Sequence, residues 1–220
     1  DGYYQMPKKF SAKLRYRLVF ENVKGFSIGF NLVITPASVS TLGKSGPGGV
    51  DALITSSSEG KLFRRCVVNN AAYDYVTRCS YDDMDILPPP GDLRIWIFHS
   101  LEVSSAVMLH HGAVVDSKLI SSFLGEFASL LKAFLPDVTL GAKGKNDYSS
   151  LYSTVCHELA HASHFSRVGT GYWNKYIRYI IESYITTGDP YGDGQASGAE
   201  YCGLGESWAY YLESLMYKER

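Results

Sequence analysis

Apolar and polar side chains alternate in the first part of the chain. Between residues 14 and 20 every second side chain is apolar, which predicts a β-strand with one buried face. No helical period is present before residue 88. The pattern therefore predicts a small all-β, sandwich-like module over residues 1–87. Its further strands are expected at 26–34, 50–55, 62–68 and 73–79, with a loop at 41–49 and turns at 56–60 and 69–70.

Residues 82–91 read DDMDILPPPG and are acidic, then proline-rich. Consecutive prolines stiffen the chain and cannot join the interior of a sheet, so this segment is expected to be a linker. We accordingly expect a second domain at residues 88–220.

The pattern changes after this linker. Apolar residues recur every three or four positions over residues 117–135, which predicts a helix that Pro136 ends. The fold class is therefore expected to be α+β, with a mostly helical second domain that contains a small sheet. Strands are expected at 93–99, 106–115 and 138–140, and further helices from Ser149 or Ser150 to 169, at 172–187 and at 206–218, with a glycine-rich loop at 188–205.

Composition excludes some functions. The net charge is −1, so no basic field indicates nucleic acid as a partner. No apolar run is long enough to span a membrane, and we expect no transmembrane segment. The four cysteines leave the disulfide pattern open: Cys66 could pair with Cys79 across a predicted hairpin and Cys156 with Cys202, or all four could be reduced.

Residues 157–161 read HELAH and fit the H-E-x-x-H pattern of zinc proteases. On a helix, positions four apart differ by only about 40°, so His157 and His161 project from one face and can bind one Zn²⁺ ion. Glu158 lies at the flank of this pair, where its carboxylate can accept a proton from a metal-bound water. The alternative is a buried helix that carries these residues without a metal.

A catalytic zinc ion needs a third protein ligand. The longer pattern H-E-x-x-H-x-x-G-x-x-H fails, because neither the glycine nor the third histidine follows His161 at the required spacing. Glu206 is the preferred candidate, because it opens a predicted helix directly after the glycine-rich loop. The alternatives are Glu200, Asp189 and Asp193, whereas His164 is expected to support the ligands or to lie on the helix surface.

Residues 206–209 read Glu-Ser-Trp-Ala, and 44 residues lie between His161 and Glu206. With the HELAH motif, this run resembles the gluzincin class of zinc metallopeptidases, in which a downstream glutamate within an E-x-x-A-like run is the third ligand. The resemblance covers residues 93–218. It implies a zincin-like fold, a zinc ion held by His157, His161 and Glu206, and an edge strand beside the cleft, for which residues 108–112 are the candidate.

A second resemblance concerns the β module. Residues 58–63 read Ser-Glu-Gly-Lys-Leu-Phe between two predicted strands. This turn is similar to one in transthyretin-like, or carboxypeptidase-regulatory-like, modules.

For several other side chains, the sequence gives less specific expectations. An oxyanion stabiliser is expected, and Tyr191, Tyr201 and Tyr210 are all near the metal ligands in sequence, with none favoured. Glu213 is expected to be an ordinary solvated charge. Core positions are expected for Tyr172, Trp173, Tyr176 and Tyr179, and strand-end positions on the surface or in the cleft for His99, His110 and His111.

These residues lead to three functional hypotheses. The first is a zinc-dependent peptidase that acts on a peptide or protein, with Glu158 as general base. The second is a non-catalytic binding protein with a structural or vestigial zinc site, and the third is a zinc hydrolase acting on a non-peptide amide. We expect an exported protein, which could be secreted, periplasmic or at the cell surface. This expectation follows from the β module beside a zinc domain, the even number of cysteines and the start at Asp1. Any signal sequence or lipid anchor would lie before Asp1. The oligomeric state is not indicated.

Overall fold

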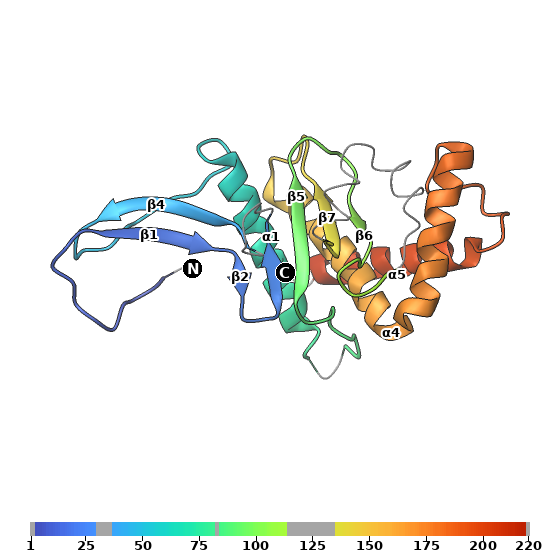
Figure 1. Cartoon of the computed structure of the whole chain (residues 1–220), viewed down its shortest axis with the longest axis horizontal. Coiled ribbons are helices and arrows are strands. Elements are labelled where there is room, and N and C mark those ends of the chain that lie inside the picture. Colours follow the sequence, from blue (N-terminus) through green and yellow to red (C-terminus); the bar gives the residue numbers. More distant parts are fainter. Residues whose placement is uncertain (1–2, 30–36, 82–83, 114–134, 219–220) are drawn as a thin grey trace.

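The computed structural model describes residues 3–29, 37–81, 84–113 and 135–218. In this part of the chain, two small β-sheets combine with three long helices (Figure 1). The helices are α1 (Gly60–Arg78), α4 (Tyr148–Thr187) and α5 (Ala199–Lys218). The architecture is mixed, in agreement with the expected α+β class.

The larger sheet has five strands in the order β2-β3-β5-β7-β6. Its three central strands are parallel, and the strands at both edges run antiparallel to their neighbours. Helices α1 and α4 pack against the sheet and against each other, and Tyr75 of α1 donates a hydrogen bond to Ser163 of α4 (3.0 Å). The strands are β2 (Glu21–Asn22), β3 (Phe26–Ile28), β5 (Leu93–Phe98), β6 (Ser105–Ala106) and β7 (Val138–Gly141).

The smaller sheet is a two-stranded antiparallel ribbon that projects from the body of the molecule (Figure 1). It pairs β1 (Leu14–Val19) with β4 (Val39–Ser45). The strand predicted at residues 14–20 is confirmed. The loop predicted at 41–49 is partly wrong, because β4 extends to Ser45.

The prediction of an all-β module over residues 1–87 is wrong. Helix α1 replaces the strands predicted at 62–68 and 73–79 and the turn between them, and residues 50–55 form no strand. This segment has a strand-like composition, because it contains adjacent valines (Val67 and Val68) and two tyrosines (Tyr73 and Tyr75). Its buried side chains nevertheless follow a helical spacing, and packing of that stripe outweighs β-propensity. These side chains are Leu62, Val67, Val68, Ala71, Ala72 and Tyr75.

The two sides of the predicted linker share one sheet. Strand β3 pairs in parallel with β5, so that Phe26 lies opposite Leu93 and Ile28 opposite Ile95. One buried apolar cluster also includes residues from both sides. The turn-like segment at residues 58–63 forms the start of α1.

The strands predicted at 93–99 and 138–140 are confirmed as β5 and β7. Of the strand predicted at 106–115, the described residues contain only its beginning, in β6, while residues 107–113 form no strand. The helix predicted at 117–135 falls on residues 114–134, outside the described part of the chain, except for Leu135, which is not helical.

Helix α4 contains the HELAH motif and is bent at Gly169, whose dihedral angles (φ 73°, ψ 173°) are not helical. The helix expected to end by residue 169 and the one expected at 172–187 are therefore two segments that meet at this glycine. The first segment is capped by Asp147, whose carboxylate accepts a hydrogen bond from the backbone N–H of Ser150 (2.7 Å). The cap thus lies before the two serines that the sequence favoured.

Helix α5 begins at Ala199, seven residues earlier than predicted. The glycines of this stretch indicated a loop, but Gly205 lies inside the helix, against the ring of Tyr176. A Cβ atom at this position would lie 3.2 Å from the ring. The missing side chain therefore allows α5 to approach α4 closely, which offsets the usual cost of glycine in a helix.

No helix in the described residues is both long and apolar enough to cross a membrane. All four cysteines are free thiols. Cys66 and Cys79 lie on one helix, 13 positions and therefore about 20 Å apart, much too far for a disulfide.

Two glycines of α5 provide a matched test of this packing. Gly203→Ala should raise the free energy of unfolding by about 0.5–1 kcal/mol, because no atom lies within 4 Å of the added carbon. Gly205→Ala should be about 1 kcal/mol less stable than Gly203→Ala, because its Cβ presses on Tyr176. Chemical denaturation measures both, and an equal gain at the two positions would contradict the close helix contact.

Candidate metal centre

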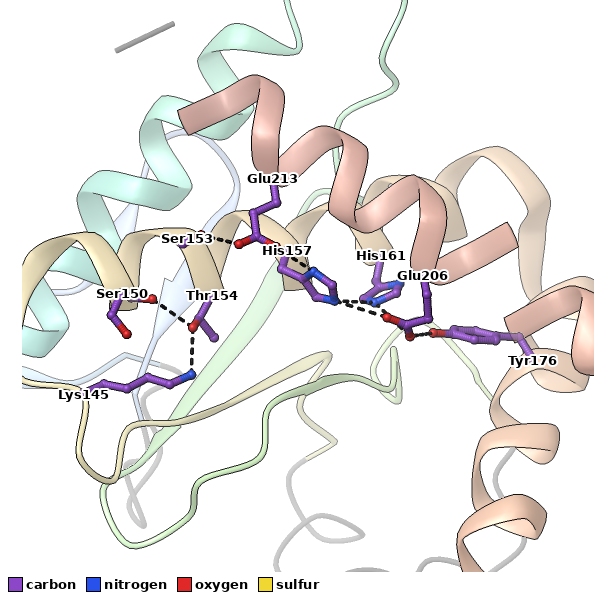
Figure 2. A network of polar contacts seen from close by, with 9 residues as sticks. All are labelled: Lys145, Ser150, Ser153, Thr154, His157, His161, Tyr176, Glu206 and Glu213. Carbon is purple, nitrogen blue, oxygen red and sulfur yellow. Dashed lines mark hydrogen bonds and ion pairs between the residues drawn. The ribbon is translucent and has the colours of Figure 1, made fainter. Parts of the chain in front are cut away.

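The two histidines of the HELAH motif lie one turn apart on the first segment of α4. Their Nε2 atoms are 3.2 Å apart (Figure 2). Two nitrogen ligands at about 2.0–2.1 Å from a tetrahedral zinc ion are separated by about 3.3 Å. The spacing of His157 and His161 therefore fits two ligands of one ion.

The carboxylate of Glu206 approaches both imidazoles from α5. Its Oε2 lies 3.4 Å from Nε2 of His157, and its Oε1 lies 3.5 Å from Nε2 of His161. All three ligand atoms lie within 4.8 Å of one another. Glu206 lies two turns inside α5, so its carboxylate has no role at the helix N-terminus.

The other predicted third ligands lie elsewhere. Glu200 is exposed in the first turn of α5. Asp189 and Asp193 each accept a hydrogen bond from a backbone N–H two residues ahead, as is typical of aspartates that form turns. The structure therefore brings together the three ligands that the sequence favoured.

The donor set fits a zinc ion. Two imidazole nitrogens and one carboxylate oxygen are a common ligand set of catalytic zinc. In addition, the buried Oε2 atom of Glu206 has no hydrogen-bond partner among the described residues. A buried carboxylate oxygen without a donor is costly, and a cation bound there would remove that cost.

Neighbouring side chains hold these ligands in place. The hydroxyl of Tyr176 donates a hydrogen bond to Oε1 of Glu206 (2.6 Å). On the far side of the His157 ring, Nδ1 is 3.0 Å from Oε2 of Glu213, which also accepts a hydrogen bond from Ser153 (Figure 2). A carboxylate on Nδ1 fixes the tautomer that leaves Nε2 free to bind a metal.

Glu213 is therefore not the ordinary solvated charge that we expected. Its spacing of seven residues from Glu206 places both carboxylates on one face of α5, two turns apart. That spacing is the sequence signal that could have identified it. For Tyr176, no comparable signal exists, because its contact with Glu206 depends on how α5 crosses α4.

The ligands attract each other electrostatically. Burial favours the neutral form of His157, but the nearby carboxylates of Glu206 and Glu213 outweigh this effect and raise its pKa to about 10. Burial alone would raise the pKa of Glu206, yet the nearby imidazoles of His157 and His161 hold it far below its usual range. A proton on His157 thus occupies the position that a metal would take, and metal binding must release it.

Glu158 is buried beside the three ligands. Its side chain interacts electrostatically with His161, His157 and Glu206, and its Oε2 atom has no hydrogen-bond partner in the part of the chain that the structure describes. Burial raises the pKa of this carboxyl group above its usual value, while the two histidines lower it. The group is therefore close to the ligands but is held by none of them.

Two of the three tyrosines considered as oxyanion stabilisers border the site. The ring of Tyr210 lies 4.8 Å from that of His157. The pKa of Tyr191 is raised by burial and then by the charge of Glu206, which places its phenol near that carboxylate. Tyr201 instead contacts the ring of Tyr172 and the ammonium group of Lys175.

The other histidines take no part in the ligand set. His164 is buried among the rings of Tyr172, Trp173 and Trp208 rather than on the helix surface. Burial, followed by the charge of His161, lowers its pKa to about 4. The remaining three bond to groups outside the site: His99 to Arg64, His110 to Asp92 and His111 to the carbonyl of Gly91.

No protein-family model, curated protein or solved structure matches this chain.

Substitution of Glu206 tests whether it is the third ligand. Glu206→Ala should weaken zinc binding by about a hundredfold or more, because losing a ligand costs more than the 10- to 100-fold typical of a supporting residue. Glu200→Ala, in the same helix, should bind zinc like the wild type. Competition with a chromogenic chelator measures both affinities. Equal affinity of the two variants would exclude Glu206 as a ligand.

Substitution of Glu213 tests whether it supports His157 as a ligand. Glu213→Gln should lower zinc affinity by about 10- to 100-fold, because the amide orients the His157 ring without the negative charge that makes it a better ligand. The same chelator assay measures the loss, and thermal melting of the zinc-free variant checks that the fold is intact. An unchanged affinity in an intact protein would remove Glu213 from the site.

Proposed function

We propose that this protein is a zinc-dependent peptidase that cleaves peptide bonds in a peptide or protein. The convergence of His157, His161 and Glu206 on a point beside the buried carboxylate of Glu158 carries this proposal. In the same proposal, the domain is a zincin-like member of the gluzincin class. Its HELAH helix, its glutamate on a later helix and its mostly parallel sheet with an antiparallel edge strand support that placement.

When bound, zinc supplies a Lewis acid that polarises the scissile carbonyl and acidifies the attacking water. Glu158 accepts the proton of that water and later delivers it to the leaving amine. Burial of the carboxyl group suits this task, because a raised pKa brings it nearer to neutral pH, where it can both accept and donate a proton. Tyr191 and Tyr210 are the candidates for stabilising the oxyanion, because both border the ligands.

The sheet offers a place for an extended substrate. Among the described residues, β6 is the last strand on its side of the sheet, and it packs against α4. An extended peptide can add to such an edge through backbone hydrogen bonds. We place the substrate there instead of at residues 108–112, which form no strand.

The alternative of a non-catalytic protein with a structural zinc site has less support. Structural zinc ions almost always have four protein ligands. In the described residues only three ligand atoms converge, and an unpaired carboxylate lies beside them. Both features favour a site with an open position for water.

The decisive variant is Glu158→Gln. It should lower the rate of peptide cleavage by about 100- to 10,000-fold, the usual contribution of a general base, and should still bind one zinc ion. Cleavage of a fluorogenic peptide library, followed by metal analysis of the same samples, measures both. The control is Glu182→Gln, an exposed carboxylate on the same helix.

Chelation of zinc should abolish cleavage by the wild type, and added zinc should restore it. Full activity of Glu158→Gln, or activity that resists chelators, would refute the proposal.

A further inference from the structure

A cluster of basic side chains lies near the start of α4, before the metal site. Lys61, Arg64 and Arg65 come from the first turns of α1, and Lys145 comes from the segment between β7 and α4. We call these four residues the basic cluster. Arg64 joins the two segments, because its Nε donates to the carbonyl of Lys145 (3.0 Å) and its Nη2 donates to the side chain of Asn146 (2.6 Å).

The hydrogen bonds of the cluster lead to neutral groups. Lys145 donates to the hydroxyl of Thr154 (2.7 Å), and Arg65 donates to that of Ser40 (3.2 Å). Within the described residues, no member of the cluster forms an ion pair with an acidic side chain. Four positive charges without such a partner repel each other and destabilise the fold.

His99 lies within this positive field. Its Nδ1 is 3.1 Å from Nη1 of Arg64. Burial lowers the pKa of His99, and the charges of Arg64, Lys61 and Arg65 lower it further. The imidazole thus stays neutral at pH 7 and does not add to the charge of the cluster.

The cluster reaches the metal site through Lys145. Thr154, its hydrogen-bond partner, precedes Glu158 by one helical turn, or about 6 Å along α4. Figure 2 shows the Lys145 side chain reaching Thr154, which lies on the same helix as His157. The acidic groups that interact with Lys145 are Glu158 and Glu213, and both already have roles at the metal centre.

We propose that the basic cluster binds acidic side chains of the substrate, which makes this protein a peptidase for acidic peptides. The inference rests on the proposed function. Carboxylates of the substrate would neutralise charges that form no ion pair within the described residues, on the Thr154 side of the scissile bond. Lys145 is the specificity-determining residue nearest to the reaction, and Arg64 positions the segment that carries it.

The test uses Glu158→Gln protein with zinc, so that peptides bind without turnover. Two labelled peptides with amidated C-termini are compared by fluorescence anisotropy, one with several glutamates and one with glutamines at the same positions. The acidic peptide should bind about tenfold more tightly, as expected for charge-assisted hydrogen bonds. Its advantage should shrink at high salt, because salt screens charges at an open site.

Lys145→Met should abolish the preference for the acidic peptide, and Lys145→Arg should retain it. The matched control is Lys143→Met, which removes the same charge two residues away, from an exposed side chain that pairs with Glu102 (2.8 Å). This control should retain the preference. Equal binding of the two peptides, or an equal loss in Lys143→Met, would overturn the inference.

Failure of the proposed function has a different signature. If the wild type with zinc cleaves neither peptide, but Lys145 still determines the preference in binding, the peptidase proposal fails and the acidic-ligand site stands. If the wild type cleaves both peptides equally and binds them equally, the peptidase proposal stands and the specificity inference fails.

Discussion

The contact between α4 and α5 is the constraint on which the rest of the site depends. Gly205 lets α5 lie against the ring of Tyr176, and the hydroxyl of that tyrosine then orients Glu206 toward the two histidines. One face of α5 carries Glu206, Tyr210 and Glu213 to the metal centre. The adjoining face anchors the helix in the core through Cys202, Ala209, Leu212 and Met216. A shift of α5 by one residue would turn all three polar side chains away from His157, because each residue rotates the helix by about 100°.

This arrangement is electrostatically costly without a metal. It gathers three carboxylates around two imidazoles in a mostly buried place, and Glu158 and Glu206 each keep an oxygen without a hydrogen-bond donor among the described residues. Such costs are typical of functional sites, where the surrounding packing maintains groups that would separate elsewhere. A divalent cation would compensate the negative charge at the centre. The basic cluster has the opposite imbalance, and an acidic substrate would compensate it in the same way.

The sequence predicted what depends on local geometry. HELAH places two histidines on one face of any helix, and the E-x-x-A run favoured Glu206 as the candidate third ligand. The glycines before this run hid the true start of α5. Contacts between distant segments could not be predicted, which is why Tyr176 and Lys145 were missed, whereas the spacing of Glu213 from Glu206 could have identified it. The error in α1 had another cause, because residues 62–79 have the composition of strands and only their packing selects a helix. The resemblance to gluzincins stays a prediction.

The central claim is that the site binds zinc with three protein ligands and leaves one position open. Diffraction from zinc-soaked crystals at the zinc absorption edge tests it most directly. One strong anomalous peak should appear, at about 2.0–2.2 Å from Nε2 of His157, Nε2 of His161 and a carboxylate oxygen of Glu206, with water as the fourth ligand. A peak at other residues, or a fourth protein ligand that closes the site, would contradict it.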